Sequence, residues 1–370
     1  MKPPAIRYLV LWLTTRCNLR CAYCYRPMEA PSTMSRATAR AALDLAASSG
    51  KRFHVQLAGG EPTLEPDLIE YVGALVRSAE WPASIALQTN GTRLDARLIE
   101  ICLRYRIEVG ISLDGPLEIQ QRIRGGARDT YRGLGLLDKA GIPARVTTVL
   151  CAENVGHLAH LAMSLASFSN VRGFGLDPLV LTGASRGRRE LMPDGTAIEQ
   201  ATKELCRTLT LLNQRRKEPL RWRELDTVRS VLTGRKGSTP YCHAACGESL
   251  AVHPSGAVYP CSQAVGEPRL AAGTLDALDW VKLAAAFEGV RIRCHDPGCV
   301  LAGRCPGDCP SRLRFNRSEA IPSMCHLYRA IAQDLSAERS AAPALMTAPV
   351  DLPVCDSHRL EGSRIYAGNR

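Results

Sequence analysis

The sequence predicts an α/β fold, a partial (β/α)6 barrel that is followed by a small cysteine-rich domain. Strand-like and helix-like segments alternate from residue 7 to about residue 180, which predicts a parallel sheet with crossover helices. Polar or glycine-rich motifs follow the early strand-like segments. Eight cysteines crowd into residues 241–325, where strand signals are short and turns are frequent. These observations divide the chain into a barrel (1–235), a cysteine-rich domain (236–335) and a tail (336–370).

The six expected strands are short, mostly apolar runs between turn signals. A segment with helical character separates each strand from the next, so the strands are expected to run in the same direction. The expected strands cover residues 8–13, 54–58, 84–89, 108–113, 144–149 and 172–176.

The helices between these strands follow from capping residues and apolar spacing. Ser35 is a suitable N-cap, and Ala39, Leu43 and Ala46 recur on one helical face before Gly50 ends the pattern. The remaining helical patterns cover residues 66–75, 94–103, 131–139, 155–165 and 198–215. The last of these connects the barrel to the cysteine-rich domain.

The composition is that of an ordinary globular chain without a membrane span. Of 370 residues, 45% are hydrophobic and 22% are charged, and no apolar run reaches the ~20 residues that a spanning helix needs. The short apolar run near the N-terminus has no signal-peptide cleavage site. Fifteen cysteines without an export signal indicate reduced, metal-binding thiols and a cytoplasmic location.

The net charge is +11, from 47 basic and 36 acidic residues. Basic residues gather at 186–189 and 215–217, which form either solvated faces or a docking surface for an acidic peptide or carrier. Aromatic residues make up only 5% of the chain, and no recognition motif for nucleic acid is present. Nucleic-acid binding is therefore not expected.

The unusual motifs fall where TIM-like barrels place their active sites, at the carboxyl ends of the strands. Cys17 follows the first expected strand, and the motifs 59–63, 88–91 and 112–115 follow or end the next three. Four consecutive strands therefore deliver metal-binding, glycine-rich or polar groups to one rim.

The residues Cys17, Cys21 and Cys24 are the first candidate metal ligands. Three thiolates are one ligand short of a four-iron cluster or a closed zinc site, so a metal centre here keeps an open position for chemistry. Half of a structural zinc site is the alternative, but no second cysteine pair or His-x-x-x-His lies nearby in the sequence.

This Cys17-x3-Cys21-x2-Cys24 spacing, with Tyr23 and with Gly59-Gly60-Glu61 downstream, resembles the radical S-adenosylmethionine (SAM) superfamily over about residues 7–180. The resemblance implies that the three cysteines bind a [4Fe–4S] cluster and that SAM chelates its fourth iron. The SAM contacts that it implies are Tyr23, Gly59, Gly60, Glu61, Asn90, Ser112 and Arg124.

Three of these contacts have a simple physical reason. Gly59 and Gly60 let the backbone approach the methionine moiety, and Glu61 can pair with its ammonium group. A plain tight turn is the alternative for the glycines, and a surface salt bridge is the alternative for Arg124. Gln120-Gln121 stands where many relatives have a His-Asp pair before this arginine.

The later cysteines resemble the SPASM domain, an extension of radical SAM enzymes that carries two auxiliary [4Fe–4S] clusters. The least typical of them is Cys294, because four residues separate it from Cys299 where two are common. Two structural zinc sites are the alternative. By the family pattern, one cluster is held by Cys242, Cys246, Cys261 and Cys309, and the other by Cys294, Cys299, Cys305 and Cys325. Core or surface thiols are expected at Cys102, Cys151, Cys206 and Cys355, with substrate handling as the alternative for Cys355.

The resemblance implies SAM and three [4Fe–4S] clusters as cofactors of an oxidoreductase. In such enzymes a 5′-deoxyadenosyl radical abstracts hydrogen from the substrate, here a peptide or protein side chain, and ribosomal peptide maturation by crosslinking or oxidation is the leading expectation. The alternatives are a sulfatase formylglycine-generating maturase, a dehydrogenase for a sugar or tetrapyrrole, and a non-enzymatic zinc or electron-transfer scaffold. Sulfatase maturases carry an aspartate after the cysteine that matches Cys261, and Ser262 stands there instead.

The implied partners are a peptide or protein substrate and a reductant such as flavodoxin or ferredoxin. Because the first strand begins by residue 8, no leader-binding domain is expected before it, and a separate leader-peptide-binding protein is expected instead. Asp177, Asp226 and Asp308 are candidate bases, and nothing in the sequence selects one of them.

Overall fold

Six parallel strands form the wall of a partial barrel in the computed structural model, which describes residues 4–234, 241–290, 292, 294, 298–317 and 321–341. All six expected strands are confirmed, with ends that differ from the expected ones by two residues at most. Their bounds are β1 Tyr8–Thr14, β2 Phe53–Gly59, β3 Ala83–Thr89, β4 Glu108–Ser112, β5 Ala144–Leu150 and β6 Val171–Pro178.

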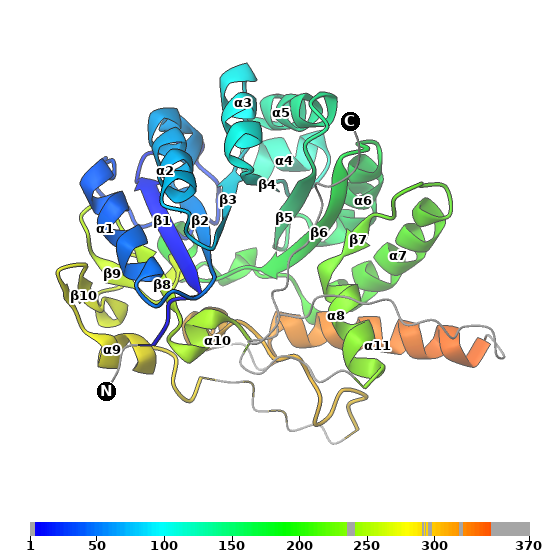
Figure 1. Cartoon of the computed structure of the whole chain (residues 1–370). Helices are drawn as coiled ribbons and strands as arrows, with labels where there is room; N and C mark the ends of the chain where they lie inside the picture. Colours follow the sequence, from blue (N-terminus) through cyan, green and yellow to red (C-terminus); the bar gives the residue numbers. More distant parts are fainter. Residues whose placement is uncertain are drawn as a thin grey trace.

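The barrel helices lie on the outer side of this curved sheet (Figure 1). Ser35 caps the first of them by accepting a hydrogen bond from the Thr38 backbone N–H, as the sequence predicts. The sequence reading missed the short α4 and also α8. The bounds are α1 Arg36–Ala47, α2 Pro66–Ser78, α3 Ala96–Tyr105, α4 Leu117–Ile123, α5 Ala127–Lys139, α6 Leu158–Ala166, α7 Gly195–Asn213 and α8 Arg223–Leu232.

The two faces of the sheet differ because side chains alternate along a strand. Leu9, Leu11 and Leu13 of β1 are fully buried in the main core, against the helices. The opposite, concave face is the inside of the barrel, and on β2 to β6 the register places several polar side chains there. Examples on this face are Gln56, Gln88, Ser112, Thr147 and Asp177, and each of them is partly accessible to solvent.

The cysteine-rich region continues the barrel sheet. Strand β8 (Ser249–Val252) pairs in parallel with β1, and β9 (Val258–Tyr259) pairs antiparallel with β8. The two-residue β7 (Arg221–Trp222) ends the sheet on the other side, so the strand order is β7-β6-β5-β4-β3-β2-β1-β8-β9. The predicted boundary at residue 235 therefore separates two segments that share one sheet.

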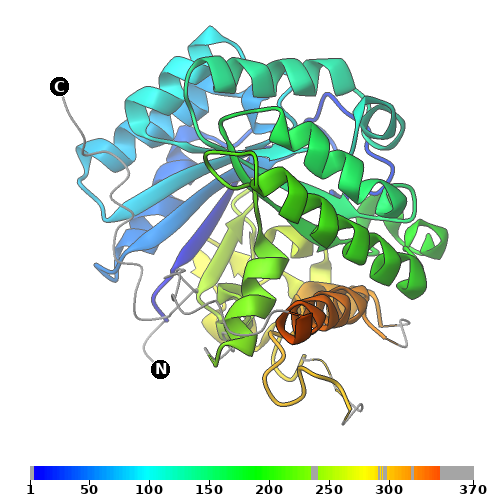
Figure 2. The same cartoon turned by 90° about the vertical axis from the view of Figure 1, so that its right-hand side faces the viewer.

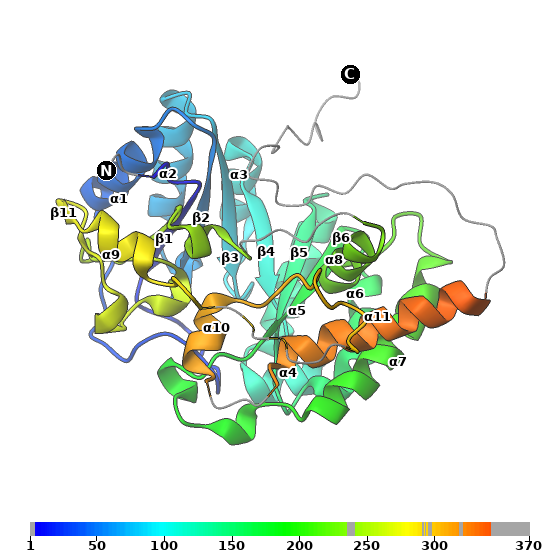
Figure 3. The same cartoon turned by 90° about the horizontal axis from the view of Figure 1, so that it is seen from below.

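The remaining elements of this region lie against the barrel (Figures 2 and 3). Helix α11 (Ser323–Ala341) packs on α7 and α8 and crosses residue 336, where the tail was expected to begin. The shorter elements are β10 Gly273–Thr274, β11 Ala277–Leu278, α9 Trp280–Ala285 and α10 Pro310–Phe315. In the described part of the chain, no helix has the length and apolarity needed to span a membrane. Cys355 lies outside the described residues.

Candidate active site

The loop that carries Cys17, Cys21 and Cys24 follows β1 and is fastened by backbone hydrogen bonds to distant parts of the barrel. The Ala22 N–H donates to the Ile123 carbonyl at 3.0 Å, and the Ala184 N–H donates to the Cys24 carbonyl at 2.8 Å. These contacts come from the ends of α4 and from the segment after β6. The barrel itself therefore fixes the course of this loop.

The structure brings the three thiols of the loop together. Burial, helped by the neighbouring Cys24 and Cys17 thiols and opposed by the Arg124 guanidinium, raises the pKa of Cys21 to about 11. Burial also raises the pKa of Cys17, with Cys24 again among its neighbours. No three His, Cys, Asp or Glu side chains in the described residues converge on one point as a single metal ion requires. A [4Fe–4S] cluster instead presents separate irons at its corners, and three thiols gathered from one loop fit that ligand set.

The turn at Gly59 and Gly60 packs directly against the start of the cysteine loop. A Cβ at Gly60 would lie 2.0 Å from the Arg16 carbonyl oxygen, and one at Gly59 would lie 2.4 Å from the Thr14 oxygen. The Gly60 N–H donates to the Thr14 carbonyl and the Glu61 N–H to the Arg16 carbonyl, each at 2.8 Å. The glycines are thus required by close backbone packing, whatever else this turn binds.

Glu61 is almost completely buried, and its carboxylate braces this turn. Its Oε1 accepts hydrogen bonds from the Thr63 N–H at 3.1 Å, the Thr63 hydroxyl at 2.5 Å and the Thr89 hydroxyl at 2.6 Å. Its Oε2 accepts one from the Asn90 N–H at 2.8 Å, which leaves this oxygen capacity for a further donor. Burial raises the pKa of Glu61, and these hydrogen bonds oppose that rise.

Asn90, at the end of β3, joins the cysteine loop to the rim. Its amide nitrogen donates to Asn18 Oδ1 at 3.0 Å, and Asn18 in turn donates to the Thr92 hydroxyl at 2.8 Å. Asn18 lies between Cys17 and Cys21 in sequence. Asn90 is therefore a structural brace of the loop in addition to being a predicted SAM contact.

Tyr23 and Arg124 meet at a buried carboxylate that the sequence reading did not single out, Asp114. The Arg124 Nε donates to Asp114 Oδ2 at 2.7 Å, and the Tyr23 hydroxyl donates to the same oxygen. The Arg124 guanidinium also lies over the Tyr23 ring, 5.3 Å from the ring centroid, which is within the reach of a cation–π contact. The Arg124 side chain is only 10% exposed, so its ion pair is a buried one and not a surface salt bridge.

Ser112 lies on the concave face at the end of β4. Its hydroxyl accepts a hydrogen bond from Gln88 Nε2 at 2.9 Å. Gly110 makes room for that glutamine, because a Cβ there would lie 2.4 Å from Gln88 Oε1. Ser112 and Gln88 together place polar groups on the rim beside Asp114.

The division of the eight later cysteines into two ligand sets stays a prediction, and the thiols that lie near one another are consistent with it. In the first, burial raises the pKa of Cys261, and Cys309 and Cys242 contribute as its nearest thiols; Cys246 is the thiol neighbour of Cys242. The Cys309 thiol donates to Gln263 Oε1 at 3.7 Å, so this group lies just after β9. The assignment of these thiols to one cluster stays a prediction, and the structure brings all four of them together.

In the second group, burial raises the pKa of Cys325 to about 11, with Cys305, Cys299 and Cys294 as neighbouring thiols. The same Cys299 and Cys294 are the thiol neighbours of Cys305. Cys294, the least typical ligand by sequence, therefore lies with the thiols that it was expected to join. Cys102, Cys151 and Cys206 are buried core residues, as predicted.

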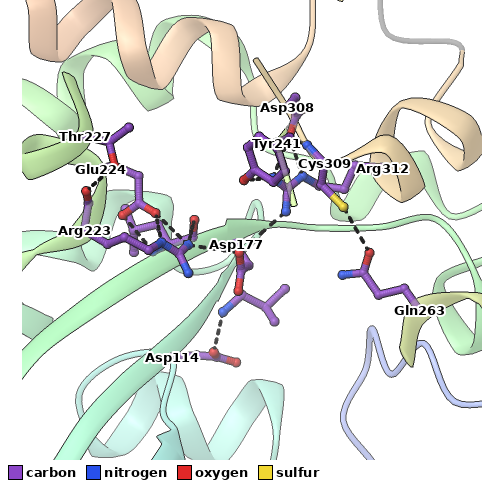
Figure 4. Close-up of polar contacts among 12 residues, drawn as sticks. Asp114, Asp177, Arg223, Glu224, Thr227, Tyr241, Gln263, Asp308, Cys309 and Arg312 are labelled. Atoms are coloured by element: carbon purple, nitrogen blue, oxygen red, sulfur yellow. Dashed lines mark hydrogen bonds and ion pairs between the residues drawn. The ribbon is translucent and has the colours of Figure 1, made fainter. Parts of the chain in front are cut away.

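A cluster of charged residues, missed by the sequence reading, links the barrel rim to the first of these groups (Figure 4). Asp177, at the end of β6, lies 3.0 Å from Arg223 Nη2 and 3.6 Å from Arg312 Nη1. Arg312 is 4% exposed and forms a 2.5 Å ion pair with Asp308, the neighbour of Cys309. Burial opposes ionisation of Asp177, but the two guanidinium groups outweigh it and lower its pKa.

The contacts of the three aspartates that the sequence analysis named as candidate bases distinguish them from one another. Asp308 is buried and engaged with Arg312 and with the Cys309 N–H. Asp226 pairs with Arg221 at 2.9 Å. Asp177 is the one of the three that the strand register places on the concave face, with its side chain 32% exposed.

Ser262, next to Cys261, joins the cysteine-rich region to the barrel. The Trp12 indole N–H donates to the Ser262 hydroxyl at 2.8 Å, and the Tyr25 hydroxyl lies 3.0 Å from it. Burial raises the pKa of Tyr25 to about 12. Ser262 therefore connects the two regions through hydrogen bonds between uncharged side chains.

Comparison with known proteins identifies the class of this enzyme. Residues 13–165 match the family described as the radical SAM superfamily. An uncharacterized protein of Methanocaldococcus jannaschii is 30% identical over 264 residues, which are 69% of this chain and 85% of that protein. The chain belongs to the radical SAM superfamily and is an enzyme of that class. Membership implies SAM and a [4Fe–4S] cluster as cofactors.

Among the relatives with described activities are two whose coverage of this chain differs strongly. A Fe-coproporphyrin III synthase of Methanosarcina barkeri is 36% identical over 158 residues, 40% of this chain and only 38% of that protein. A serine-type anaerobic sulfatase-maturating enzyme of Klebsiella aerogenes is 25% identical over 331 residues, 80% of this chain and 78% of that protein.

The fold is also that of a solved structure described as native anSMEcpe with bound AdoMet and Kp18Cys peptide. The TM-score is 0.76 at 19% identity, covering 91% of this chain and 99% of that one. At this identity the likeness establishes the shared fold, including the region that follows the barrel.

Proposed function

We propose that this radical SAM enzyme is of the SPASM type and removes hydrogen from a side chain of a peptide or protein substrate. The proposal is supported by the neighbouring thiols of the later cysteines, which are consistent with two sets of four, beside a barrel whose three-cysteine loop is one ligand short. Four thiols complete a [4Fe–4S] cluster, whereas three leave an iron open.

Three clusters follow from these ligand sets. Cys17, Cys21 and Cys24 would hold the cluster that binds SAM. Each auxiliary cluster would have a full set of four thiolates, namely Cys242, Cys246, Cys261 and Cys309 for one, and Cys294, Cys299, Cys305 and Cys325 for the other. Full ligation leaves no iron site for substrate, so these two would transfer electrons.

When bound, SAM and the reduced cluster supply a 5′-deoxyadenosyl radical that abstracts a hydrogen atom from the substrate. The residues of the chain bind and orient the reactants. Glu61 Oε2 retains the capacity to accept a hydrogen bond from the SAM ammonium group, beside the Gly59-Gly60 turn. Arg124, held by Asp114 and Tyr23, would present a fixed positive charge to the SAM carboxylate, and Ser112 a hydroxyl to its ribose.

The concave face supports a large polar substrate. It is lined along several strands by partly accessible polar groups, including Gln88, Ser112 and Asp177. The backbone donors and acceptors of a peptide can form hydrogen bonds with these polar groups. A purely apolar ligand would bury the same groups without hydrogen-bond partners. The proposal also includes a flavodoxin or ferredoxin as electron donor and a separate protein that binds the substrate's leader peptide.

Sulfatase maturation is the second candidate, because the sulfatase-maturating relative matches four fifths of this chain. The residue after Cys261 argues against it. Ser262 is held by Trp12 and Tyr25, and a serine hydroxyl does not accept a proton near neutral pH. Asp177, across the barrel, is the carboxylate that remains on the concave face.

The first experiment tests the enzyme class without a substrate. Anaerobically reconstituted protein should hold about twelve irons, four for each of three clusters. Dithionite and SAM should then yield 5′-deoxyadenosine, and Cys24→Ala should abolish this product while retaining about eight irons. Failure of the wild type to cleave SAM would contradict the proposal, and zinc in place of iron in the C-terminal region would contradict the SPASM assignment.

The second experiment identifies the substrate class by mass spectrometry. Short peptides encoded beside the gene, a sulfatase-derived peptide with Cys or Ser at the target position, and a coproporphyrin are each incubated with enzyme, SAM and dithionite. A loss of hydrogen from the encoded peptide, with product dependent on Cys24, supports peptide maturation. Formylglycine in the sulfatase peptide would instead support sulfatase maturation, and modification of the porphyrin alone would support a tetrapyrrole substrate. Either result would contradict peptide maturation.

A further inference from the structure

Arg26 carries a buried donor that has no protein partner among the described residues. Its Nε is shielded from solvent and is without a hydrogen bond, while its Nη1 donates to the Thr15 carbonyl. A buried donor left unpaired costs about 1–3 kcal/mol, and more when the group is charged. Such an atom in a native protein indicates a missing partner.

The position of Arg26 indicates what that partner is. The residue lies two positions after Cys24 in sequence, and its bond to Thr15 brings the guanidinium back to the start of the loop, two positions before Cys17. The orphaned donor therefore lies beside the thiols predicted to hold the SAM-binding cluster.

We propose that Arg26 Nε–H donates a hydrogen bond to a sulfur atom of the cluster held by Cys17, Cys21 and Cys24, and that Arg26 thereby sets the reduction potential of this cluster. The inference rests on the proposed cluster at these cysteines. It assigns Arg26 as a positioning and tuning residue, and not as a ligand.

The direction of the effect follows from charge. Reduction adds one electron to a cluster that already carries negative charge on its thiolates and sulfides. A hydrogen bond from a cation stabilises the reduced form more than the oxidised form, which raises the reduction potential. Arg26 should thus make the cluster easier to reduce by a protein donor.

Two substitutions separate the charge from the hydrogen bond. Arg26→Met removes both, and Arg26→Lys keeps a positive charge but lacks Nε. The matched control is Arg20→Met, because Arg20 is in the same loop, between Cys17 and Cys21, and its side chain is exposed. Solvent and salt screen an exposed charge, so its removal should change the potential little.

The test is a redox titration of reconstituted protein without SAM, followed by electron paramagnetic resonance. The signal of this cluster is obtained by subtracting the Cys24→Ala spectrum. Arg26→Met should lower the equilibrium constant for reduction at least tenfold, which is about 59 mV for one electron. Arg26→Lys should fall between Arg26→Met and the wild type, and Arg20→Met should change the constant less than about threefold.

A spectroscopic readout keeps the proposal testable if Arg26→Met does not fold. With 15N-guanidino-labelled arginine, a 15N hyperfine coupling to the reduced cluster should be lost in Arg26→Lys and kept in Arg20→Lys. Equal potentials in Arg26→Met and wild type at equal iron content would overturn the proposal. The proposal would also be overturned if Arg26→Met weakened SAM binding and left the reduction potential unchanged, because Arg26 would then contact SAM and not the cluster. Absence of any cluster in the wild type would instead contradict the proposed function.

Discussion

Two regions of this molecule gather cysteines, and they are held in different ways. In the loop of residues 17–24, the hydrogen bonds reach distant parts of the chain: Ala22 binds to Ile123, Asn18 binds to Thr92 and Cys24 binds to Ala184. The barrel therefore fixes this loop from several directions.

In the described residues 298–309, the backbone hydrogen bonds are local. The Ala302 N–H donates to the Cys299 carbonyl at 2.8 Å, and the Arg304 N–H donates to the Leu301 carbonyl at 3.1 Å. The Gly307 N–H donates to the Cys305 thiol at 3.5 Å. Backbone hydrogen bonds of this range order a turn, and the longer-range contacts of this segment come from side chains such as Leu301 and Cys309.

The difference matches the two kinds of ligation that we propose. A site with an open iron must hold its geometry while SAM binds and leaves, so the protein framework supplies the rigidity. A fully ligated cluster can itself hold its surroundings, because metal binding and folding are coupled in such sites. The comparison thus predicts that iron matters structurally for one region and much less for the other.

Removal of iron should have the largest effect and tests this comparison directly. In chelated, iron-free protein, amide hydrogen exchange in residues 298–309 should accelerate at least 100-fold. The backbone hydrogen bonds of this segment are local, so the segment can open once the cluster is removed. Exchange in residues 15–24 should change less than tenfold. Hydrogen exchange with mass spectrometry measures both regions in one sample. Equal acceleration in both would contradict the assignment of the rigid framework to the barrel loop.

The next effect concerns a buried ion-pair link between the auxiliary region and the barrel. Arg312→Met leaves Asp308 buried without its cation and removes the contact to Asp177. Loss of one partner of a buried ion pair costs about 3–5 kcal/mol, so the free energy of unfolding should fall by that amount.

The matched control for Arg312 is an exposed pair. Arg97 contacts Asp67 and Glu70 with its side chain 52% exposed, so solvent screens these pairs and Arg97→Met should change the free energy of unfolding far less than Arg312→Met. Urea unfolding of iron-loaded protein measures both variants. Similar losses in the two would show that the auxiliary region does not depend on this link.

The barrel side of the comparison is tested by Gly60→Ala. The new Cβ would lie 2.0 Å from the Arg16 carbonyl, so the backbone of the cysteine loop must move, at an expected cost of about 2–4 kcal/mol. Gly135→Ala in α5 is the control, because its Cβ meets open space, and alanine in a helix should stabilise by about 0.5–1 kcal/mol. Thermal unfolding measures both. An unchanged Tm for Gly60→Ala would show that the loop is less tightly held than its contacts indicate.

The sequence predicted the barrel strands well because each has a strong local signal. Buried parallel strands are short apolar runs, and the six runs correspond to β1–β6. The two cysteine groups are predicted only from the family pattern, since spacing alone does not say which thiols meet. The link of β8 to β1 had no local signal, because pairing between distant strands is decided by the assembled sheet.

The missed features have physical reasons as well. Asp114 was inside a recognised motif, but its meeting with Tyr23 and Arg124 depends on α4, whose seven residues give too short a periodic pattern to detect. The tail boundary at residue 336 was placed on composition, whereas alanine is also the best helix former, and α11 continues to Ala341. Close packing of Gly60 against Arg16 is a tertiary contact that no local pattern contains.

The smallest expected effect concerns pH and the contact between the two regions. Arg223 and Arg312 lower the pKa of Asp177 below its ordinary value, near 3.8. A carboxyl group with a lowered pKa in the folded state stabilises the protein above the unfolded pKa, and this stability is lost as the pH falls through the folded pKa. Asp177→Asn should therefore lower the free energy of unfolding by about 1 kcal/mol at pH 7 and by almost nothing near pH 2. Asp129→Asn, in an exposed pair with Arg132, should have little effect at pH 7. Urea unfolding at the two pH values measures the loss of stability in each variant. An equal loss at both pH values in Asp177→Asn would mean that Asp177 stabilises the protein through packing. The charge of Asp177 would then not contribute to the contact between the barrel and the auxiliary region.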